Sequence, residues 1–336
     1  MTDSEDELRT AAKPRNVYIR PILWGTLGGW ALIFVPYLIA LIVRHGDVTF
    51  LLQDNPLWQY SVGLILLMPG VQGLITGLMF GRDKRDAVGG VSAIFILWLV
   101  DLVGGVAVLR EGVICLIMAA PILLAITAIG YIIGRLLARW KVGRKTSVSL
   151  APLLVVFVVA ETLAPAPDAP FSVTDTVTVA APPDYVWRYV LDYPDNPAPP
   201  KYWMWSIGLP YPTHSVAPVQ AVGQRRDCKF SGNQAFEERI AVLQPNKRLV
   251  FDITKQPQHP EIIGHMTVDR GEILLRPNAD GTTTIIATSW YRLHVRPAGY
   301  FGWWAEDVTR HIHFRVLGYM KTLAERDYRA AKGKAL

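Results

Sequence analysis

The chain has 336 residues, of which 51% are hydrophobic, and its mean hydropathy is +0.24. Its net charge of +6 arises from 34 basic and 28 acidic residues. The basic residues occupy several short segments and do not form the single basic face that nucleic-acid binding requires. Length and composition therefore predict two unlike domains and argue against a nucleic-acid-binding protein.

The N-terminal half contains five long apolar runs. The first, Ile22–Val43, has 22 residues and no charge, which is enough for a helix to cross a bilayer. The other runs are Leu57–Phe80, Ala87–Leu109, Gly112–Gly134 and Val148–Leu163. None of them has the polar face that recurs in the helices of soluble proteins. We therefore predict a tail over residues 1–21 and an all-α region of five transmembrane helices over residues 22–163.

The basic residues of the connecting segments are distributed unevenly. Twelve lie before the first run, between the second and third, or between the fourth and fifth, whereas the alternate segments hold only Arg44 and Arg110. Such a bias places the basic segments in the cytoplasm. We therefore expect an integral protein of the bacterial inner or plasma membrane, with a cytoplasmic N-terminus. After five crossings, the C-terminal domain is expected in the periplasm or outside the cell.

The apolar runs carry few groups that suggest transport. Asp101 and Glu161 are intramembrane acids, which are functional candidates by default, but both lie near the end of a run. Glycine pairs four residues apart, such as Gly73 and Gly77, allow close helix packing. We therefore expect the runs to form a packed anchor.

The second half begins with a proline-rich linker over residues 164–171, which is expected to be extended. Residues 172–330 then have the pattern of an α+β domain, in which predicted strands are followed by a long helix. Strands are predicted at Phe171–Val179, Arg225–Phe230, Phe236–Leu243, Arg248–Lys255, Met266–Arg276 and Thr282–Val295, because apolar and β-branched residues alternate there. A long helix is predicted over Gly302–Lys332, and it must cover the apolar face of the sheet.

Two segments of this domain carry a resemblance to a known family. They read VAAPPDYVWRYVLD, starting at Val179, and LGYMKTLAERD, ending at Asp327. The region from Val173 to Arg329 resembles the START-like helix-grip superfamily (SRPBCC), in particular its polyketide cyclase/dehydrase and lipid transport type. The resemblance implies a curved antiparallel sheet, a long C-terminal helix and a cavity between them for a hydrophobic ligand. It does not imply one reaction, because related folds bind, carry, cyclise or hydrolyse their ligands.

Aromatic residues are dense in the same domain and suit an apolar wall that orients a ligand. They are also consistent with ordinary core, or with a position at the membrane surface. On the strand Thr282–Val295, alternation places Trp290, Arg292 and His294 on one face and Tyr291 on the other. Either face is compatible with a cavity. The candidate ligand contacts are Trp203, Trp205, Trp290, Arg292, His294, Trp304, His311 and Arg315.

The terminal helix also offers a polar row. Asp307, His311 and Arg315 are spaced four apart and share one face, where they would orient or protonate a ligand head group or form a solvated salt-bridge row. His311 and Asp307, together with Glu238 in a predicted strand, are the catalytic candidates. His311 and His313 point in different directions and no metal-ligand spacing occurs, so no metal and no cofactor are predicted.

Three classes of function remain open. The first is a membrane-anchored protein that binds or carries a lipid-like or polyketide-like molecule on the non-cytoplasmic side. The second is a cyclase, dehydratase or hydrolase that acts on such a molecule. The third is an envelope sensor or assembly partner that contacts another protein. The sequence favours the binder over the enzyme, because it contains no nucleophile elbow and no recognisable catalytic constellation.

Overall fold

The computed structural model describes residues 16–43, 67–81, 87–109, 111–139, 168–262 and 265–333. The chain forms two compact units, Met1–Pro165 and Ala166–Leu336.

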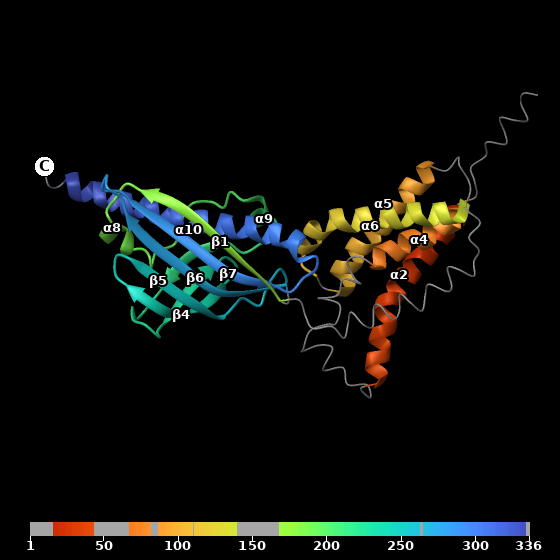
Figure 1. Cartoon of the computed structure of the whole chain (residues 1–336), viewed down its shortest axis with the longest axis horizontal. Helices are drawn as coiled ribbons and strands as arrows, with labels where there is room; N and C mark the ends of the chain where they lie inside the picture. Colours follow the sequence, from red (N-terminus) through yellow and green to blue (C-terminus); the bar gives the residue numbers. More distant parts are fainter. Residues whose placement is uncertain are drawn as a thin grey trace, which may run out of the picture. The chain divides into compact units, whose positions relative to one another are not determined.

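The described elements of the N-terminal unit are all helices (Figure 1). Its elements are α2 (Asn16–Val43), α4 (Met68–Phe80), α5 (Ala87–Gly104), which continues as the π-helix η3 (Gly105–Leu109), and α6 (Val113–Arg139). Within the described residues, Val88–Ala107 and Val113–Arg139 are long and apolar enough to span a membrane. The prediction of five spans stays a prediction. The fifth predicted run, Val148–Leu163, and residues 57–66 of the second lie outside the described residues.

Helices α4 and α6 approach closely because glycines line their contact. A Cβ atom added at Gly73 would lie 2.1 Å from the backbone oxygen of Thr127, and one at Gly77 would lie 2.2 Å from that of Tyr131. The approach is reciprocal, since a Cβ atom at Gly130 would lie 2.1 Å from the oxygen of Gly70. Only glycine allows backbones to come this close, a type of packing that is also found between membrane helices.

A polar contact lies inside the same unit. The side-chain amide of Gln72 on α4 donates a 2.8 Å hydrogen bond to the carboxyl group of Asp101 on α5. Both side chains are buried. Asp101, a functional candidate from the sequence, therefore contacts a neighbouring helix at this point and joins α4 to α5.

The C-terminal unit is one seven-stranded antiparallel sheet with a long helix beside it (Figure 1). The strands are β1 (Ala169–Val179), β2 (Pro212–Val216), β3 (Arg225–Phe230), β4 (Gln234–Gln244), β5 (Arg248–Lys255), β6 (Met266–Pro277) and β7 (Thr283–Leu293). Their order in the sheet is β1-β7-β6-β5-β4-β3-β2. The first strand thus pairs with the last, and every pair is antiparallel.

The strands predicted from the sequence are confirmed, with ends that differ by a few residues at most. The sequence did not reveal β2 or the short helix α9 (Trp203–Ser206). Both follow the proline-rich stretch YPDNPAPP and have only five and four residues, which is too short for a periodic pattern. A second short helix, α8 (Pro183–Trp187), begins with proline at its first position, where the missing amide proton costs no hydrogen bond.

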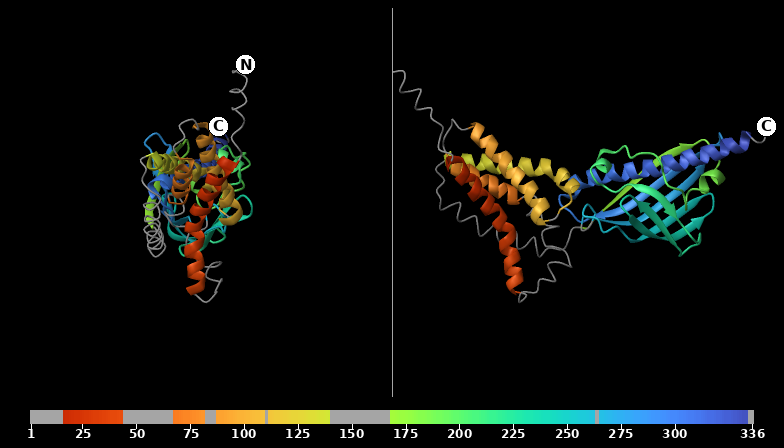
Figure 2. Two further views of the ribbon diagram at one scale, coloured as in Figure 1. Left: turned by 90° about the vertical axis from the view of Figure 1, so that its right-hand side faces the viewer. Right: turned by 180° about the vertical axis from the view of Figure 1, so that it is seen from behind.

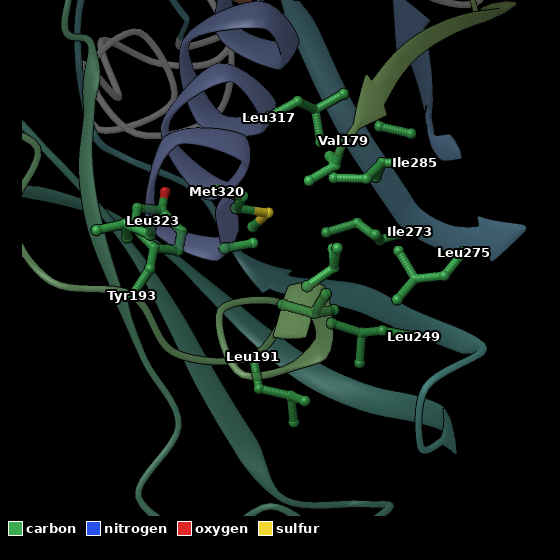
Figure 3. Close-up of a cluster of buried hydrophobic side chains, with 14 of the residues drawn as sticks. Val179, Leu191, Tyr193, Leu249, Ile273, Leu275, Ile285, Leu317, Met320 and Leu323 are labelled. Carbon is green, nitrogen blue, oxygen red and sulfur yellow. The ribbon is translucent and has the colours of Figure 1, made fainter. Parts of the chain in front are cut away.

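The helix α10 (Ala298–Gly333) lies along the sheet, as the right-hand view of Figure 2 also shows. Leu317, Met320 and Leu323 of α10 belong to one cluster of buried side chains together with Val179 of β1 and Ile285 of β7 (Figure 3). All five side chains are at most 4% exposed, and burying each contributes about 2 kcal/mol. This core fixes α10 against β1 and β7 and positions the part of the helix that precedes it.

Candidate functional site

A cavity of about 150 Å³ lies between the inner face of the sheet and α10. Its walls come from β3, β4, β5, β6 and β7 and from the middle of α10. Most of the lining is apolar: Phe230, Phe236, Phe251, Ile253, Met266, Val268, Ile273, Ala287, Val308, Ile312, Val316 and Leu317. Polar side chains among these walls belong chiefly to two groups, one on β3 and β4 and the other on β7 and α10.

Strand alternation determines which residues reach the cavity. On β7, Ala287, Ser289 and Tyr291 line it from one face, and Thr288 between them also reaches it. On β6, Gly271 leaves space that the ring of Phe251 fills, because a Cβ atom there would lie 2.3 Å from the ring. A glycine inside a strand often marks such a close approach. The absence of a side chain at this position therefore shapes one wall.

The first polar group is an ion pair between Arg226 on β3 and Glu238 on β4, whose side chains are each 3% exposed. Arg226 also donates a hydrogen bond of 2.9 Å to the backbone oxygen of Leu191, and its guanidinium lies 5.1 Å from the centre of the Phe251 ring. Burial raises the pKa of Glu238, and the charge of Arg226 opposes this effect. The pair is thus held by several contacts and lies in the wall as a fixed dipole.

Two weakly acidic groups lie beside this ion pair. Burial and the Glu238 carboxylate raise the pKa of the free thiol Cys228 to about 12. Burial also raises the pKa of the Tyr193 hydroxyl well above its usual value. Both groups therefore stay protonated at neutral pH, and Cys228 lacks the thiolate character of a reactive cysteine.

The second polar group is a chain of hydrogen bonds through His313 on α10. Its Nε2 atom lies 2.8 Å from Oγ of Ser289, and its Nδ1 atom lies 2.8 Å from Oδ2 of Asp175 on β1. Arg310 donates a 2.5 Å hydrogen bond to the other oxygen of Asp175. His313 and Asp175 are 7% and 4% exposed. Ser289 and His313 line the cavity, and Asp175 lies behind them.

His313 is neutral at physiological pH. Burial lowers its pKa from the ordinary 6.5, and the hydrogen bond to Asp175 opposes this shift. An ionised carboxylate only accepts hydrogen bonds, so Nδ1 carries the proton that points to Asp175. Nε2 then accepts the hydroxyl proton of Ser289.

A further polar atom accompanies this chain. Tyr291 lies two residues after Ser289 on the same face of β7 and lines the same cavity. Its ring stacks on Phe171, and its hydroxyl oxygen is buried with no hydrogen-bond partner among the described residues. A buried hydroxyl without a partner is costly.

Of the residues singled out in the sequence, only Glu238 lines this cavity. Trp290 lies on the opposite face of β7, in an open groove with charged residues such as Arg270 and Glu272. Arg292 forms ion pairs with Asp269 and Asp168. His294 shares a 2.7 Å hydrogen bond with Thr267. Alternation could not decide between the two faces of this strand, and the cavity lies on the Tyr291 face.

Other predicted residues form a separate aromatic cluster on α9 and α10. His311 stacks on Tyr202 at 3.8 Å between ring centres, and Tyr202 donates a 2.6 Å hydrogen bond to Asp307. Trp205 meets His311 edge-on, and the guanidinium of Arg315 lies 5.7 Å from the Trp205 ring. The three residues of the predicted row on α10 therefore lie close together. Their contacts hold the segment before β2 against α10.

The remaining candidates also lie outside the cavity lining. Trp203 is 46% exposed, and Trp304 is half-buried with its indole nitrogen unpartnered in the described part of the chain. The segment from Lys201 to Tyr211 contributes no residue to the lining of the cavity. It packs on α10 through the aromatic cluster.

Sequence reasoning missed Asp175, Ser289 and His313. A signal for Asp175 was available, because it alternates with Val173 and Val177 on the face of β1 that turns inward. An acid at such a position needs a partner inside the protein. His313 carried no local signal, since its partners lie 138 and 24 residues away. Within the described residues, no group of His, Cys, Asp or Glu is placed to hold a metal ion.

Residues 170–325 match the model of the family described as polyketide cyclase / dehydrase and lipid transport. The C-terminal domain has the helix-grip fold. This agrees with the curled antiparallel sheet, the long terminal helix and the cavity between them. No curated protein matches the chain.

Several solved structures align with this domain. An aromatase/cyclase (Zhui) from Streptomyces sp. R1128 is 21% identical, with 48% of this chain and 98% of that chain covered and a TM-score of 0.34. Norcoclaurine synthase from Thalictrum flavum is 12% identical, with 49% and 96% covered and a TM-score of 0.32. A protein from Nitrosospira multiformis is 19% identical, with 44% and 93% covered and a TM-score of 0.29.

Proposed function

We propose that the chain is a membrane-anchored protein whose C-terminal domain binds or carries a lipid-like or polyketide-like molecule on the non-cytoplasmic side. The observation that carries the proposal is the largely apolar cavity between the sheet and α10. Apolar walls with a few fixed polar groups are typical of small-molecule sites. The family match over residues 170–325 agrees with this class of ligand.

The dimensions and chemistry of the cavity restrict the ligand further. Its volume of about 150 Å³ is smaller than the pockets of roughly 300–1,000 Å³ that hold drug-sized ligands. A fused ring system or a short part of an acyl chain suits this space better than a whole phospholipid. The Arg226–Glu238 pair and the Ser289–His313 pair would each orient one polar atom of such a ligand.

Features of both units support a location at a membrane. The N-terminal unit contains two helices long and apolar enough to span one. The C-terminal domain exposes large apolar side chains on α9, just after it and on α10: Trp203, Ile207, Trp303 and Phe314. Tryptophan is enriched where proteins meet the lipid head groups. A domain tethered beside a bilayer would encounter apolar ligands at a high local concentration.

The binding proposal is tested on the full chain purified in mild detergent. Small molecules that copurify with it are extracted and identified by mass spectrometry. Ala287→Leu adds bulk inside the cavity and should reduce the bound molecule severalfold. Thr176→Leu is the matched control, because Thr176 lies exposed on the outer face of β1. Equal occupancy in the two variants would reject the cavity as the site. A cavity that is always empty would favour the sensor or assembly role.

A second candidate function is an enzyme of the cyclase or dehydratase type. The hydrogen-bonded chain of Ser289, His313 and Asp175 favours it, because two of its members line the cavity. Turnover requires a proton acceptor of suitable basicity within reach of the ligand, and a neutral histidine meets this requirement. The catalytic candidates His311 and Asp307 lie outside the cavity, so they do not support this function.

A further inference from the structure

A second hollow lies on the outer face of the sheet, which turns away from α10. It is an open groove of about 450 Å³ across β5, β6 and β7, a volume typical of small-molecule sites. Trp290 of β7 lies in this outer groove, and strand pairing places Arg270 of β6 beside Trp290 and Asp252 of β5 beside Arg270. Only Glu272 is shared with the lining of the cavity.

The ring of Trp290 is free to contact a ligand. The residue is half-buried, and its indole forms no ring contact and no hydrogen bond within the part of the chain that is described. Its partner on β1 is Ser172, whose small side chain is exposed and leaves that side of the ring uncovered. An indole offers a flat apolar surface together with one polar N–H group. Trp290 is therefore a platform in an otherwise charged groove.

Two ion pairs form the polar part of the groove. Nε of Arg270 donates a 2.7 Å hydrogen bond to Asp252, and Nε of Arg248 donates one of 2.7 Å to Glu272. Each guanidinium thus keeps further N–H donors. One oxygen of each carboxylate accepts no hydrogen bond from the described residues. Each ion pair therefore presents both donors and acceptors to a ligand.

A β-bulge adds a third carboxylate to the groove. The pairing of β6 with β7 shifts register between Val268 and Arg270, and the adjacent residues Asp269 and Arg270 both line the groove. Arg292 holds Asp269 through hydrogen bonds of 2.7 and 2.9 Å. Bulges often redirect a side chain at a functional site. Because these side chains already have partners on rigid strands, little order has to be imposed when a ligand binds.

The charges of the groove restrict the class of ligand. Its lining contains two arginines, Arg248 and Arg270, against three carboxylates, Asp252, Asp269 and Glu272. Without an excess of positive charge, the groove does not attract phosphate or carboxylate groups. It suits a neutral molecule whose hydroxyls both donate and accept hydrogen bonds, and which has a flat face of C–H groups that can lie on an indole. Pyranose sugars have both properties.

We propose that the outer groove binds a neutral saccharide. One sugar ring lies with its C–H face on Trp290. Its hydroxyls donate to the carboxylates of Asp252 and Glu272 and accept from the guanidinium groups of Arg270 and Arg248. The groove volume of about 450 Å³ accommodates a disaccharide. The inference does not rest on the proposed function, because the platform faces away from the cavity. The exported location predicted from the charge bias would bring the groove among envelope glycans.

The test uses saturation-transfer difference NMR, which detects weak binding of sugars to large particles. The full chain in lipid nanodiscs is mixed with maltose, cellobiose or N,N′-diacetylchitobiose, and empty nanodiscs give the background. At least one of these neutral disaccharides should receive saturation, chiefly at the C–H protons of one ring face. The anionic disaccharide digalacturonate should receive less. No transfer to any of the three neutral sugars, or stronger transfer to digalacturonate, would overturn the proposal.

The platform is tested by titrating the disaccharide that binds the wild type. Trp290→Ala should weaken its binding by about tenfold or more, because the surface under the sugar ring is lost. Trp290→Phe keeps a flat ring and should retain most of the affinity. Trp303→Ala is the matched control, since Trp303 is 76% exposed on α10 and does not line the groove. Equal dissociation constants in the wild type and Trp290→Ala would reject this site.

The polar part is tested by Asp252→Asn, which also serves if Trp290→Ala fails to fold. Asp252 and Arg270 are 42% and 52% exposed, so breaking their ion pair should hardly change the melting temperature. Affinity for the disaccharide should fall severalfold, because a charged hydrogen-bond acceptor is lost. Wild-type affinity in this variant would overturn the proposed site. Any molecule copurified in the cavity should be retained in both variants, so the two binding functions are tested separately.

Discussion

Arg226 and Glu238 face each other on neighbouring strands and form an ion pair in the wall of the cavity, with 3% of each side chain exposed. Two buried charges stabilise a fold only while both are present, because each alone would lack its compensating partner. Arg226 also donates hydrogen bonds to the backbone oxygens of Leu191 and Val190. The pair therefore joins the sheet to the segment that follows α8.

Removing one partner should therefore be costly. We expect Glu238→Ala to lower the free energy of unfolding by about 3–5 kcal/mol, because it leaves the Arg226 charge buried and unpaired. The exposed pair of Arg225 with Asp227 is the control, and Arg225→Ala should cost less than about 1 kcal/mol. Chemical denaturation of the full chain, followed by near-UV circular dichroism, measures both. Equal losses in the two variants would mean that water reaches the Glu238 site.

His313 should make stability depend on pH. Burial places its pKa below the ordinary 6.5, while Asp175 on β1 raises it and Arg310 on α10 lowers it. Below about pH 6.5 the unfolded chain binds a proton that the native histidine does not, so the free energy of unfolding falls as the pH falls through this window. His313→Asn removes that proton uptake.

The measurement compares the wild type with His313→Asn by chemical denaturation at about pH 7.5 and about pH 5.5, on either side of the unfolded histidine pKa. The wild type should lose more stability than the variant between these two conditions. The difference isolates His313, because all other groups titrate in both proteins. An identical pH dependence would indicate that the imidazolium is accommodated in the native state.

A substitution at Gly271 should change the shape of the cavity through the Phe251 ring. A Cβ atom at this position would lie 2.3 Å from the Phe251 ring, so Gly271→Ala should push that ring toward the cavity. We expect a loss of about 1–3 kcal/mol in unfolding free energy, typical of overpacking, and weaker retention of the copurified molecule. Gly318→Ala is the control, since its Cβ would meet nothing within 4 Å and alanine favours a helix. Retention is measured by mass spectrometry, and undiminished retention in Gly271→Ala would contradict the cavity assignment.

The contact between α4 and α6 gives a prediction for the N-terminal unit. Gly73→Ala should disrupt it, because the new Cβ would lie 2.1 Å from a backbone oxygen that cannot move aside. Gly70→Ala should be tolerated, since its nearest neighbour is the Ile126 side chain at 3.3 Å. Size-exclusion chromatography of the heated, detergent-solubilised proteins compares them. Equal heat resistance would show that the helices do not pack through Gly73.

The sequence predicted the elements of the C-terminal domain well, because strand alternation and helical spacing are local patterns. The strand over Arg248–Lys255, for example, was placed with both ends correct. The cavity between the sheet and the terminal helix also followed from the resemblance. Short elements such as β2 escaped, since five residues carry too little periodicity to distinguish a strand from a loop.

The site was harder to predict, because it depends on which strand face turns inward and on contacts between distant residues. Trp290 and Tyr291 are neighbours with similar side chains, yet only Tyr291 reaches the cavity. His311 attracted attention through its spacing from Asp307, whereas His313 joins Asp175 across 138 positions. Pairing of β1 with β7 brings Asp175 next to Ala287, two residues from Ser289, and no local pattern reports such a pairing.

The orientation of the chain is the last prediction. Twelve basic residues in three segments against two in the alternate ones predict a cytoplasmic N-terminus and an exported C-terminal domain. Alkaline phosphatase fused after residue 336 should therefore be active, and a green fluorescent protein at the same position should stay dark, because it does not fold after export in the unfolded state. Replacing only Arg82, Lys84 and Arg85 by acidic residues should leave the orientation unchanged, since the other two basic segments remain. A fluorescent C-terminal fusion with inactive phosphatase would place the helix-grip domain in the cytoplasm and require an even number of crossings.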